Sequence, residues 1–205
     1  MTKRVRKAAV LGAGVMGAQI AAHLANAGVE VVLFELPAKE GDKSAMAKKA
    51  IASLKKLKPA PFAAKGVEGA LKPANYEEHL EELRDCDIII EAIAERLDWK
   101  QDLYRKIGPA LNPNAIIASN TSGLSITSLA DVLPEALRPR FCGVHFFNPP
   151  RYMSLVELIP TKYTQPELLD VLDTFLVSQL GKGVVRAKDT PNFIGNRIGV
   201  FGILS

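Results

Sequence analysis

The chain has 205 residues, of which 48% are hydrophobic and 23% are charged, as is ordinary for a globular protein. This length suits one sizeable α/β domain, or one domain and the start of another. The formal net charge is only +4. The two cysteines, Cys86 and Cys142, have no motif spacing, which argues against a disulfide framework and indicates a reducing compartment. We therefore expect a cytoplasmic location.

The N-terminal segment allows two interpretations. MTKRVRK followed by AAVLGAGVMGAQIAAHLA resembles the basic and apolar regions of a signal peptide. Three glycines, together with Gln19 and His23, interrupt the apolar stretch and weaken that interpretation. No other stretch is long and apolar enough to span a bilayer, so we expect no membrane insertion.

Patterns typical of strands and helices alternate along the chain. The expected strands are Lys7–Leu11, Glu30–Phe34, Asp87–Ile93, Ala115–Ala118, Arg140–Phe147, Ser154–Ile159 and Gly183–Arg186. The expected helices are Val15–Ala27, Ser44–Leu57, Tyr76–Leu83, Asp98–Ile107, Ser125–Val132, Gln165–Leu180 and a last one from Phe193 onward, with Lys58–Pro73 irregular. This alternation predicts an α/β fold with a doubly wound, mostly parallel sheet and antiparallel strands at its C-terminal edge.

A glycine motif lies between the first expected strand and the first expected helix. Gly12-Ala-Gly-Val-Met-Gly17 matches G-x-G-x-x-G. Gly12 permits a tight turn, Gly14 lets the backbone approach a pyrophosphate, and Gly17 lets the helix pack closely on the strand. The helix N-terminus, at Val15 and Met16, favours the negative charge of a pyrophosphate. The alternative is a glycine-rich turn without a ligand.

An acidic residue stands where a dinucleotide site needs one. Glu35 ends the second expected strand, 18 residues after Gly17, where a carboxylate can hydrogen-bond the hydroxyls of an adenosine ribose. Such a carboxylate repels a 2′-phosphate, so the pattern favours NAD over NADP. Together with the glycines, it predicts a Rossmann-type NAD-binding domain.

The stretch GVHFFNPP, residues 143–150, places a histidine in an apolar strand that Asn148-Pro-Pro ends. If this strand and the next form an antiparallel hairpin with its turn centred on Arg151, His145 lies opposite Glu157, with Cβ atoms about 4.5–5.5 Å apart. A carboxylate that fixes the tautomer of a histidine is typical of a general base. The same pair could instead be a structural bridge between two buried polar groups.

The stretch SNTSGLS, residues 119–125, follows an expected parallel strand. Ligands bind at that edge of open α/β sheets. Its hydroxyls could hold a substrate carbonyl, or could cap the following helix. The sequence leaves both alternatives open.

Six segments occur in an order that resembles a known family: GAGVMGAQIA, EAIAE, ASNTSGLSIT, GVHFFNPP, LVELI and KDTPNFIGNR. They are similar to the L-3-hydroxyacyl-CoA dehydrogenase family of fatty-acid β-oxidation. The resemblance covers nearly the whole chain, and HFFNP and NTS are its most specific parts. It implies an enzyme that oxidises the 3-hydroxyl of an acyl-CoA to a ketone, with NAD as the hydride acceptor.

The resemblance also implies roles for single residues. His145 would be the general base and Glu157 its orienting partner, while Ser122 and Asn196 would hydrogen-bond the reacting oxygen or the thioester region. The positions that would line the NAD site are Glu95, Lys100, Ser122 and Asn148. The positions expected to contact coenzyme A are Ser53, Lys56 and Lys58.

The coenzyme A region falls in a lysine-rich segment. Between Lys39 and Lys72 there are nine lysines and three acidic residues. A positive helix suits the phosphates of coenzyme A, and a solvated lysine face is the alternative. Because the charge is confined to one segment without interleaved aromatic residues, we expect no nucleic-acid partner.

Three positions depart from the family's pattern. Glu35 stands where aspartate is common, Gly123 replaces a frequent second serine, and Asn192 stands where glycine is usual. Asparagine tolerates a positive φ better than other non-glycine residues, so we expect the turn at Asn192 to survive.

We expect residues 1–190 to form the NAD-binding domain and residues 191–205 to begin a helical domain, which in the family closes over the substrate and forms the dimer interface. Because the chain stops within the apolar run IGVFGILS, we expect a fragment that binds NAD and holds an acyl-CoA poorly. The resemblance implies a homodimer and a fused or associated enoyl-CoA hydratase as partners, and no metal. The alternatives are a dehydrogenase of a free hydroxy acid and a non-catalytic NAD-binding or structural protein.

Overall fold

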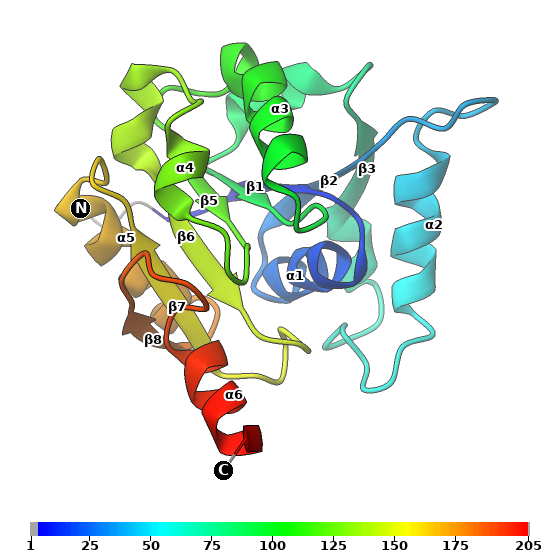
Figure 1. The fold of residues 1–205 in the computed structure, drawn as a ribbon. Helices are drawn as coiled ribbons and strands as arrows, with labels where there is room; N and C mark the ends of the chain where they lie inside the picture. Colours follow the sequence, from blue (N-terminus) through cyan, green and yellow to red (C-terminus); the bar gives the residue numbers. More distant parts are fainter. Residues whose placement is uncertain (1–3, 205) are drawn as a thin grey trace.

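An eight-stranded sheet with helices on both of its faces forms the centre of the computed structural model, which describes residues 4–204 (Figure 1). The strands are β1 (Lys7–Leu11), β2 (Glu30–Glu35), β3 (Leu71–Asn75), β4 (Ile88–Glu91), β5 (Ile116–Ser119), β6 (Phe141–Phe146), β7 (Leu155–Pro160) and β8 (Gly183–Arg186). The helices are α1 (Val15–Asn26), α2 (Ala45–Leu54), α3 (Leu97–Ile107), α4 (Ile126–Ala130), α5 (Pro166–Ser178) and α6 (Gly195–Leu204). None of the helices in this part of the chain is long and apolar enough to cross a membrane.

The strands follow the order β3-β2-β1-β4-β5-β6-β7-β8. Neighbouring strands from β3 to β6 are parallel, β7 runs antiparallel to β6, and β8 is parallel to β7. The predicted α/β fold, with a mostly parallel sheet and antiparallel strands at its C-terminal edge, is therefore confirmed.

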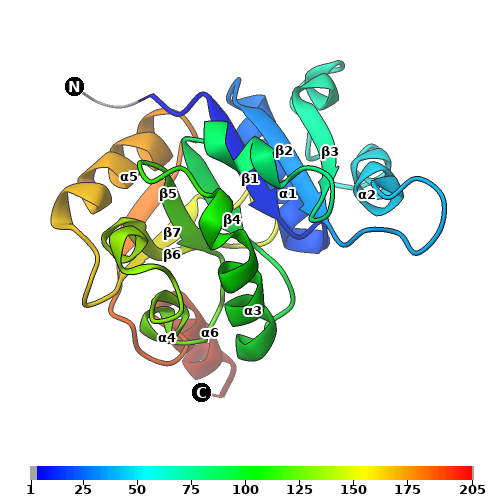
Figure 2. The same ribbon diagram turned by 90° about the horizontal axis from the view of Figure 1, so that it is seen from above.

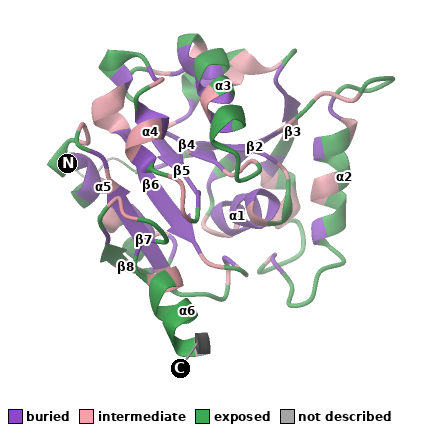
Figure 3. Cartoon of the chain, in the orientation of Figure 1, coloured by how far each residue is buried: buried purple, intermediate pink, exposed green. Residues whose placement is uncertain are grey.

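Both faces of the sheet are buried at its central strands, whose successive side chains point to opposite sides and pack in two apolar layers, whereas the edge strand β8 is largely exposed. In β1, Ala8 and Val10 pack in the apolar layer that includes α1 and α5. Ala9 and Leu11 pack in the opposite layer with α3 and α4. Figure 3 shows the resulting pattern of buried strands and exposed outer helix faces, with α6 largely exposed. Two-sided burial explains why these strands read as continuous apolar runs.

The expectation that residues 58–73 are irregular is wrong in its last part. Val67–Ala70 form a 3₁₀ helix, and Leu71–Asn75 form the edge strand β3, which lies beside β2 (Figure 2). Pro73 hides this strand from a sequence pattern, since proline lacks the N–H that a central strand needs. An edge strand tolerates it, because only one of its sides is paired.

The helix expected over Tyr76–Leu83 is also replaced, by a short 3₁₀ helix at Leu80–Asp85. The side-chain oxygen of Asn75 accepts hydrogen bonds from the backbone N–H groups of Glu77 and Glu78, at 3.0 and 2.9 Å. Local bonds of this kind compete with the first turn of a helix. They hold the chain in a turn here.

One buried tyrosine gives a test of this packing. Tyr76 stacks on Phe34, with ring centroids 5.4 Å apart, and its hydroxyl has no hydrogen-bond partner among the described residues. Burial raises the pKa of Tyr76 well above 10, so the hydroxyl stays neutral. Because an unpaired buried hydroxyl is unfavourable, Tyr76→Phe is expected to leave the free energy of unfolding unchanged or to raise it by up to about 1 kcal/mol.

The matched variant is Tyr104→Phe, which removes a buried hydroxyl that does donate, to Glu91 at 3.3 Å. It is expected to lower the free energy of unfolding by about 1 kcal/mol. Urea unfolding of both variants is the measurement. Equal destabilisation by the two substitutions would show that the Tyr76 hydroxyl has a partner after all.

Candidate functional site

Most of the site residues expected from the sequence gather at one edge of the sheet. The parallel strands β1, β2, β4, β5 and β6 end there, and ligands bind at that edge of open α/β sheets. The loops and strand ends that meet there carry Gly12, Gly14, Val15, Met16, Gly17, Glu35, Glu95, Ser122, His145 and Asn148. The residues of the expected coenzyme A region lie elsewhere.

The three glycines of the motif have different reasons to be glycine. Gly12 has φ +100°, and a Cβ on it would lie 2.8 Å from the carbonyl oxygen of Ala92. A Cβ on Gly17 would lie 1.9 Å from the carbonyl oxygen of Gly12. A Cβ on Gly14 would meet no atom within 4 Å. The fold itself therefore requires Gly12 and Gly17, whereas the space at Gly14 is open for a ligand.

The helix that follows this loop offers an anion site. Gly14 is the N-cap of α1, which has no side-chain cap and no acidic residue in its first turn. Val15, the first helical residue, is 70% exposed. The N–H groups of the first turn and the helix dipole thus face solvent, where they favour a phosphate group.

A largely apolar cavity of about 560 Å³ lies beside the glycine loop, on the side of Glu35. Sequence reasoning missed most of the residues that line it. Four of these are Leu36, Tyr76, Trp99 and Lys106. Trp99 is 50% exposed and is the only tryptophan of the chain. Its place on α3 resembles any exposed helix position, so only the fold shows that it borders the cavity.

Glu35 supports the glycine loop as well as facing the cavity. One carboxylate oxygen accepts a hydrogen bond from the Ala13 N–H at 2.7 Å, and the other accepts one from the Leu36 N–H at 2.8 Å. A carboxylate has about four acceptor positions, so room for a ribose hydroxyl remains.

Glu95 and Lys100, expected at the NAD site, differ in their exposure. The Glu95 side chain is 44% exposed, and one of its oxygens accepts bonds from the Thr121 hydroxyl and from the N–H groups of Ser122 and Gly123. Partial burial acts to raise the pKa of Glu95, but these donors and the Lys100 charge outweigh it, so that the pKa is lowered. Lys100 itself is only 1% exposed.

The two alternatives for the hydroxyls of residues 119–125 are separated by the structure. Ser119 donates to Glu91 at 2.6 Å, Thr121 donates to Glu95, and Ser125 caps α4 by accepting from the Ser128 N–H. Only the Ser122 hydroxyl has no hydrogen-bond partner among the described residues. It is the one hydroxyl of this stretch that is left to a ligand.

His145 and Glu157 lie opposite each other, as expected for an antiparallel hairpin with its turn centred on Arg151. β6 and β7 pair His145 with Glu157, and Nδ1 of His145 lies 2.8 Å from Oε2 of Glu157. His145 is 3% exposed and Glu157 is 0% exposed. Nε2 of His145 has no partner among the described residues, yet it is not a fully buried atom. The carboxylate fixes Nδ1 as the protonated nitrogen, which leaves Nε2 able to accept a proton.

The second oxygen of Glu157 holds the start of α6. It accepts hydrogen bonds from the N–H groups of Ile194 and Gly195, each at 2.8 Å. Nδ2 of Asn196, in the first turn of this helix, donates to the backbone oxygen of Ser122 at 3.1 Å. Ser122, His145, Glu157 and Asn196 are thus brought together, as the resemblance implied.

The turn before α6 keeps its shape without glycine. Asn192 has φ 62°, in the left-handed region that asparagine tolerates, so the expectation that the turn survives is confirmed. A Cβ on Gly123 would lie 3.1 Å from Oδ1 of Asn192. The asparagine side chain therefore stands close to the place where the missing serine would begin.

The expected coenzyme A region is not part of this cluster. Ser53, Lys56 and Lys58 are exposed on α2 and the segment after it, and α2 stands on the far side of α1 from α6 (Figure 1). The Ser53 hydroxyl donates to the Lys49 carbonyl of its own helix.

A tie nevertheless joins this segment to the turn of the β6–β7 hairpin. Nη1 of Arg151 donates to the carbonyl oxygens of Ala60 and Phe62 at 2.7 and 2.8 Å. The Tyr152 hydroxyl donates to Ala60 at 2.9 Å. The hairpin turn begins at Asn148, whose Oδ1 accepts a bond from Gln19 at 3.3 Å.

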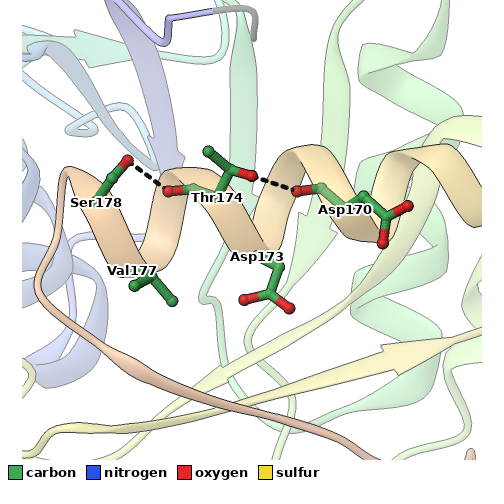
Figure 4. A pocket seen from close by; sticks show the side chains of 5 residues that line it. All are labelled: Asp170, Asp173, Thr174, Val177 and Ser178. Atoms are coloured by element: carbon green, nitrogen blue, oxygen red, sulfur yellow. Dashed lines mark hydrogen bonds between the residues drawn. The ribbon is translucent and has the colours of Figure 1, made fainter.

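A hollow on the outer face of α5 is not a second site (Figure 4). Its hydroxyls, on Thr174 and Ser178, bond to carbonyl oxygens of the helix itself. Of its two carboxylates, Asp170 bonds Arg186, and Asp173 lies 3.6 Å from the same guanidinium. Little polar capacity is left for a ligand.

The different roles of the glycines give a prediction. Gly14→Ala is expected to leave the free energy of unfolding nearly unchanged and to weaken NADH binding about tenfold, because the methyl group occupies the open space that a pyrophosphate needs. Gly17→Ala is expected to lower the free energy of unfolding by about 1–3 kcal/mol or more, because it overpacks the turn. NADH titration and urea unfolding measure both. Normal NADH affinity in Gly14→Ala would contradict the expectation that a pyrophosphate occupies the space at Gly14.

Acidification gives a second prediction. The pKa of Glu95 lies below its ordinary value of 4.5 in the folded state. The stability that this carboxylate contributes is therefore present above pH 4.5 and is lost as the pH falls through the lowered value. The difference in unfolding free energy between the parent and Glu95→Gln should shrink over that range. A pH-independent difference at Glu95 would contradict the prediction.

Comparison with known proteins gives a consistent result. The family described as 3-hydroxyacyl-CoA dehydrogenase, NAD binding domain, matches residues 7–190. A probable 3-hydroxyacyl-CoA dehydrogenase of Deinococcus radiodurans is 45% identical over 98% of this chain and 58% of that protein. A putative fatty acid oxidation complex trifunctional enzyme of Rickettsia felis is 44% identical over 98% of this chain and 28% of that protein. The crystal structure of FadB2 from M. tuberculosis has a TM-score of 0.84 at 32% identity, over 98% of this chain and 70% of that one.

The chain spans 28% and 58% of the length of two of the curated relatives that it matches. The matched region contains the glycine loop, the anion site of α1 and the adjoining cavity, and the matching domain is an NAD-binding one. This chain belongs to the 3-hydroxyacyl-CoA dehydrogenase family.

Proposed function

We propose that this chain carries the cofactor site and the catalytic groups of an NAD-dependent dehydrogenase that oxidises L-3-hydroxyacyl-CoA to 3-oxoacyl-CoA in fatty-acid β-oxidation. One observation carries the proposal. Nδ1 of the buried His145 is fixed by Glu157, while its Nε2 stays open, and the same carboxylate holds the start of α6, whose Asn196 bonds Ser122. The names of the relatives support an acyl-CoA substrate.

The pair performs general base catalysis in this proposal. Nε2 of His145 takes the proton of the substrate's 3-hydroxyl. The hydrogen on C3 leaves as a hydride, with the electron pair of its bond, and the carbonyl of the ketone forms. Bound NAD supplies the acceptor for that hydride. The Glu157 carboxylate keeps the proton on Nδ1 before the reaction and stabilises the imidazolium that forms. A structural bridge alone would not require Nε2 to stay accessible.

Ser122 and Asn196 position the substrate. The free Ser122 hydroxyl donates to the reacting oxygen, and the bond from Asn196 to the Ser122 backbone keeps α6 against this loop. Oδ1 of Asn196 has no partner among the described residues, so the amide retains capacity for the thioester region. Glu95 and Asn148 line the nicotinamide end of the cofactor.

The coenzyme A part of the proposal rests on charge. Lys56 and Lys58 are exposed and have no ion-pair partner within residues 4–204, so they are available for the phosphates of coenzyme A, with Ser53 beside them. The extension of this proposal to the whole protein includes residues 1–190 as the NAD-binding domain and 191–205 as the start of a helical domain. It also includes a homodimer through that domain, an enoyl-CoA hydratase partner and a cytoplasmic location. The name of the Rickettsia felis relative, a trifunctional enzyme of a fatty acid oxidation complex, supports further activities beside the dehydrogenase.

The experiment that tests the activity follows NADH loss with acetoacetyl-CoA. Residues 1–205 are compared with a longer form of the protein that continues into the helical domain. Turnover by the longer form alone would support the dehydrogenase and a site completed by that domain. Turnover of free acetoacetate at an equal rate would instead favour a hydroxy-acid dehydrogenase. No NADH loss with either form, while NADH still binds, would favour a non-catalytic NAD-binding protein.

A substitution at the histidine is the sharper test. His145→Gln is expected to lower kcat by roughly 10²–10⁴-fold, because the general base is lost, with NADH affinity nearly unchanged. The matched control is His79→Gln, at a histidine that precedes the 3₁₀ helix Leu80–Asp85 and lies outside the site. The control should keep parental kcat. Full activity in His145→Gln would refute the mechanism.

A further inference from the structure

A buried carboxylate with no assigned role lies beneath the cofactor site. Glu91, the last residue of β4, is 0% exposed. Its two oxygens accept hydrogen bonds from Lys100 Nζ at 2.5 Å, the Ser119 hydroxyl at 2.6 Å, the Ile93 N–H at 2.7 Å and the Tyr104 hydroxyl at 3.3 Å. All the acceptor capacity of the carboxylate is therefore used inside the protein.

The main partner, Lys100, is equally enclosed. Its Nζ lies 2.5 Å from Glu91, 3.3 Å from the carbonyl oxygen of Ile93 and 3.6 Å from Oε2 of Glu95. Two of the three N–H donors of this ammonium group have hydrogen-bond acceptors, at Glu91 and Ile93, and the contact with Glu95 is an ion pair. With 1% exposure, Lys100 acts on a ligand through the groups that it holds.

The chain of contacts continues to the loop that carries Ser122. Glu95, next to the Lys100 charge, accepts hydrogen bonds from the N–H groups of Ser122 and Gly123 at 2.8 and 3.2 Å. The carbonyl oxygen of Glu91 accepts the Asn120 N–H at 2.7 Å, so strand β4 holds the same loop from its other end.

We propose that Glu91 is a positioning residue of the NAD site. Its buried charge keeps Lys100 in place as a cation beside Glu95, and Glu95 in turn holds residues 121–123 in the shape that receives the cofactor. This inference rests on NAD as the cofactor and not on the proposed acyl-CoA substrate.

The physical argument is that packing alone does not require an ion pair here. Replacing a buried pair by apolar groups of similar size is often neutral or stabilising, whereas removing one partner leaves an uncompensated buried charge. The pair carries one positive charge against the two carboxylates of Glu91 and Glu95. The one negative charge that Lys100 does not balance is thus that of Glu95. There it is stabilised by hydrogen bonds from the N–H groups of Ser122 and Gly123.

The test separates stability from cofactor binding. The variants are Glu91→Gln, Lys100→Met and the double variant that combines them. Glu91→Gln is expected to lower stability and to weaken NADH binding at least tenfold, the size of one lost hydrogen bond to a charged group. In the double variant stability should recover, because no fully buried charge is left uncompensated and Glu95 is 44% exposed, while NADH affinity should stay low.

Two readouts are measured without substrate. NADH affinity is followed by energy transfer from Trp99, the only tryptophan of the chain, which lines the cavity. Hydrogen exchange of the Ser122 and Gly123 N–H groups reports the loop, and it should be faster in Glu91→Gln and in the double variant. If Glu91→Gln does not fold, the double variant carries the test alone.

The matched control is Glu82→Gln, which removes a carboxylate that pairs with Lys7 and Lys72 away from the site. It should change neither NADH affinity nor exchange at Ser122. Parental NADH affinity in a folded double variant would overturn the proposal, and so would equal exchange at the loop. Because no acyl-CoA is present, neither result bears on the proposed dehydrogenase substrate.

Discussion

A single buried carboxylate, that of Glu157, joins the parts of the site that come from distant stretches of the chain. One oxygen holds His145 on the neighbouring strand, and the other holds the N–H groups of Ile194 and Gly195, where α6 begins. A buried charge is tolerated only when it is fully hydrogen-bonded. The Glu157 carboxylate therefore holds the start of α6 against the β6–β7 hairpin. In this position Asn196, in the first turn of α6, donates a hydrogen bond to Ser122.

The same device recurs along the carboxyl edge of the sheet. Glu35 holds Ala13 in the glycine loop, Glu95 holds Ser122 and Gly123, and Asp189 accepts the N–H groups of Ile126 and Thr127 at the start of α4. Each loop is fixed by a carboxylate from another part of the chain. The first turn of α1 has no such carboxylate, so its N–H groups remain available to an anion.

Local patterns predict much of this arrangement, because they depend on spacing within one or two elements. The glycine motif follows from a turn between one strand and one helix, and the His145–Glu157 pair follows from a period of two and one hairpin centre. The partners of Glu91 were beyond such reasoning. DIIIEAI reads as a buried strand, and nothing in its period shows that Lys100 folds back onto it from a helix. Strand β3 was missed because Pro73 resembles a breaker, although the edge of a sheet accepts it.

The tie from Arg151 to Ala60 and Phe62 gives the molecule a fixed internal length. It joins the turn of the β6–β7 hairpin to the segment that follows the lysine-bearing helix α2, so these two parts of the chain are held together. A ligand that touches both the lysines and His145 must match a distance set by the protein. The protein therefore constrains the length of the part of such a ligand that lies between the lysines and His145. It places no constraint on the parts that extend beyond either contact.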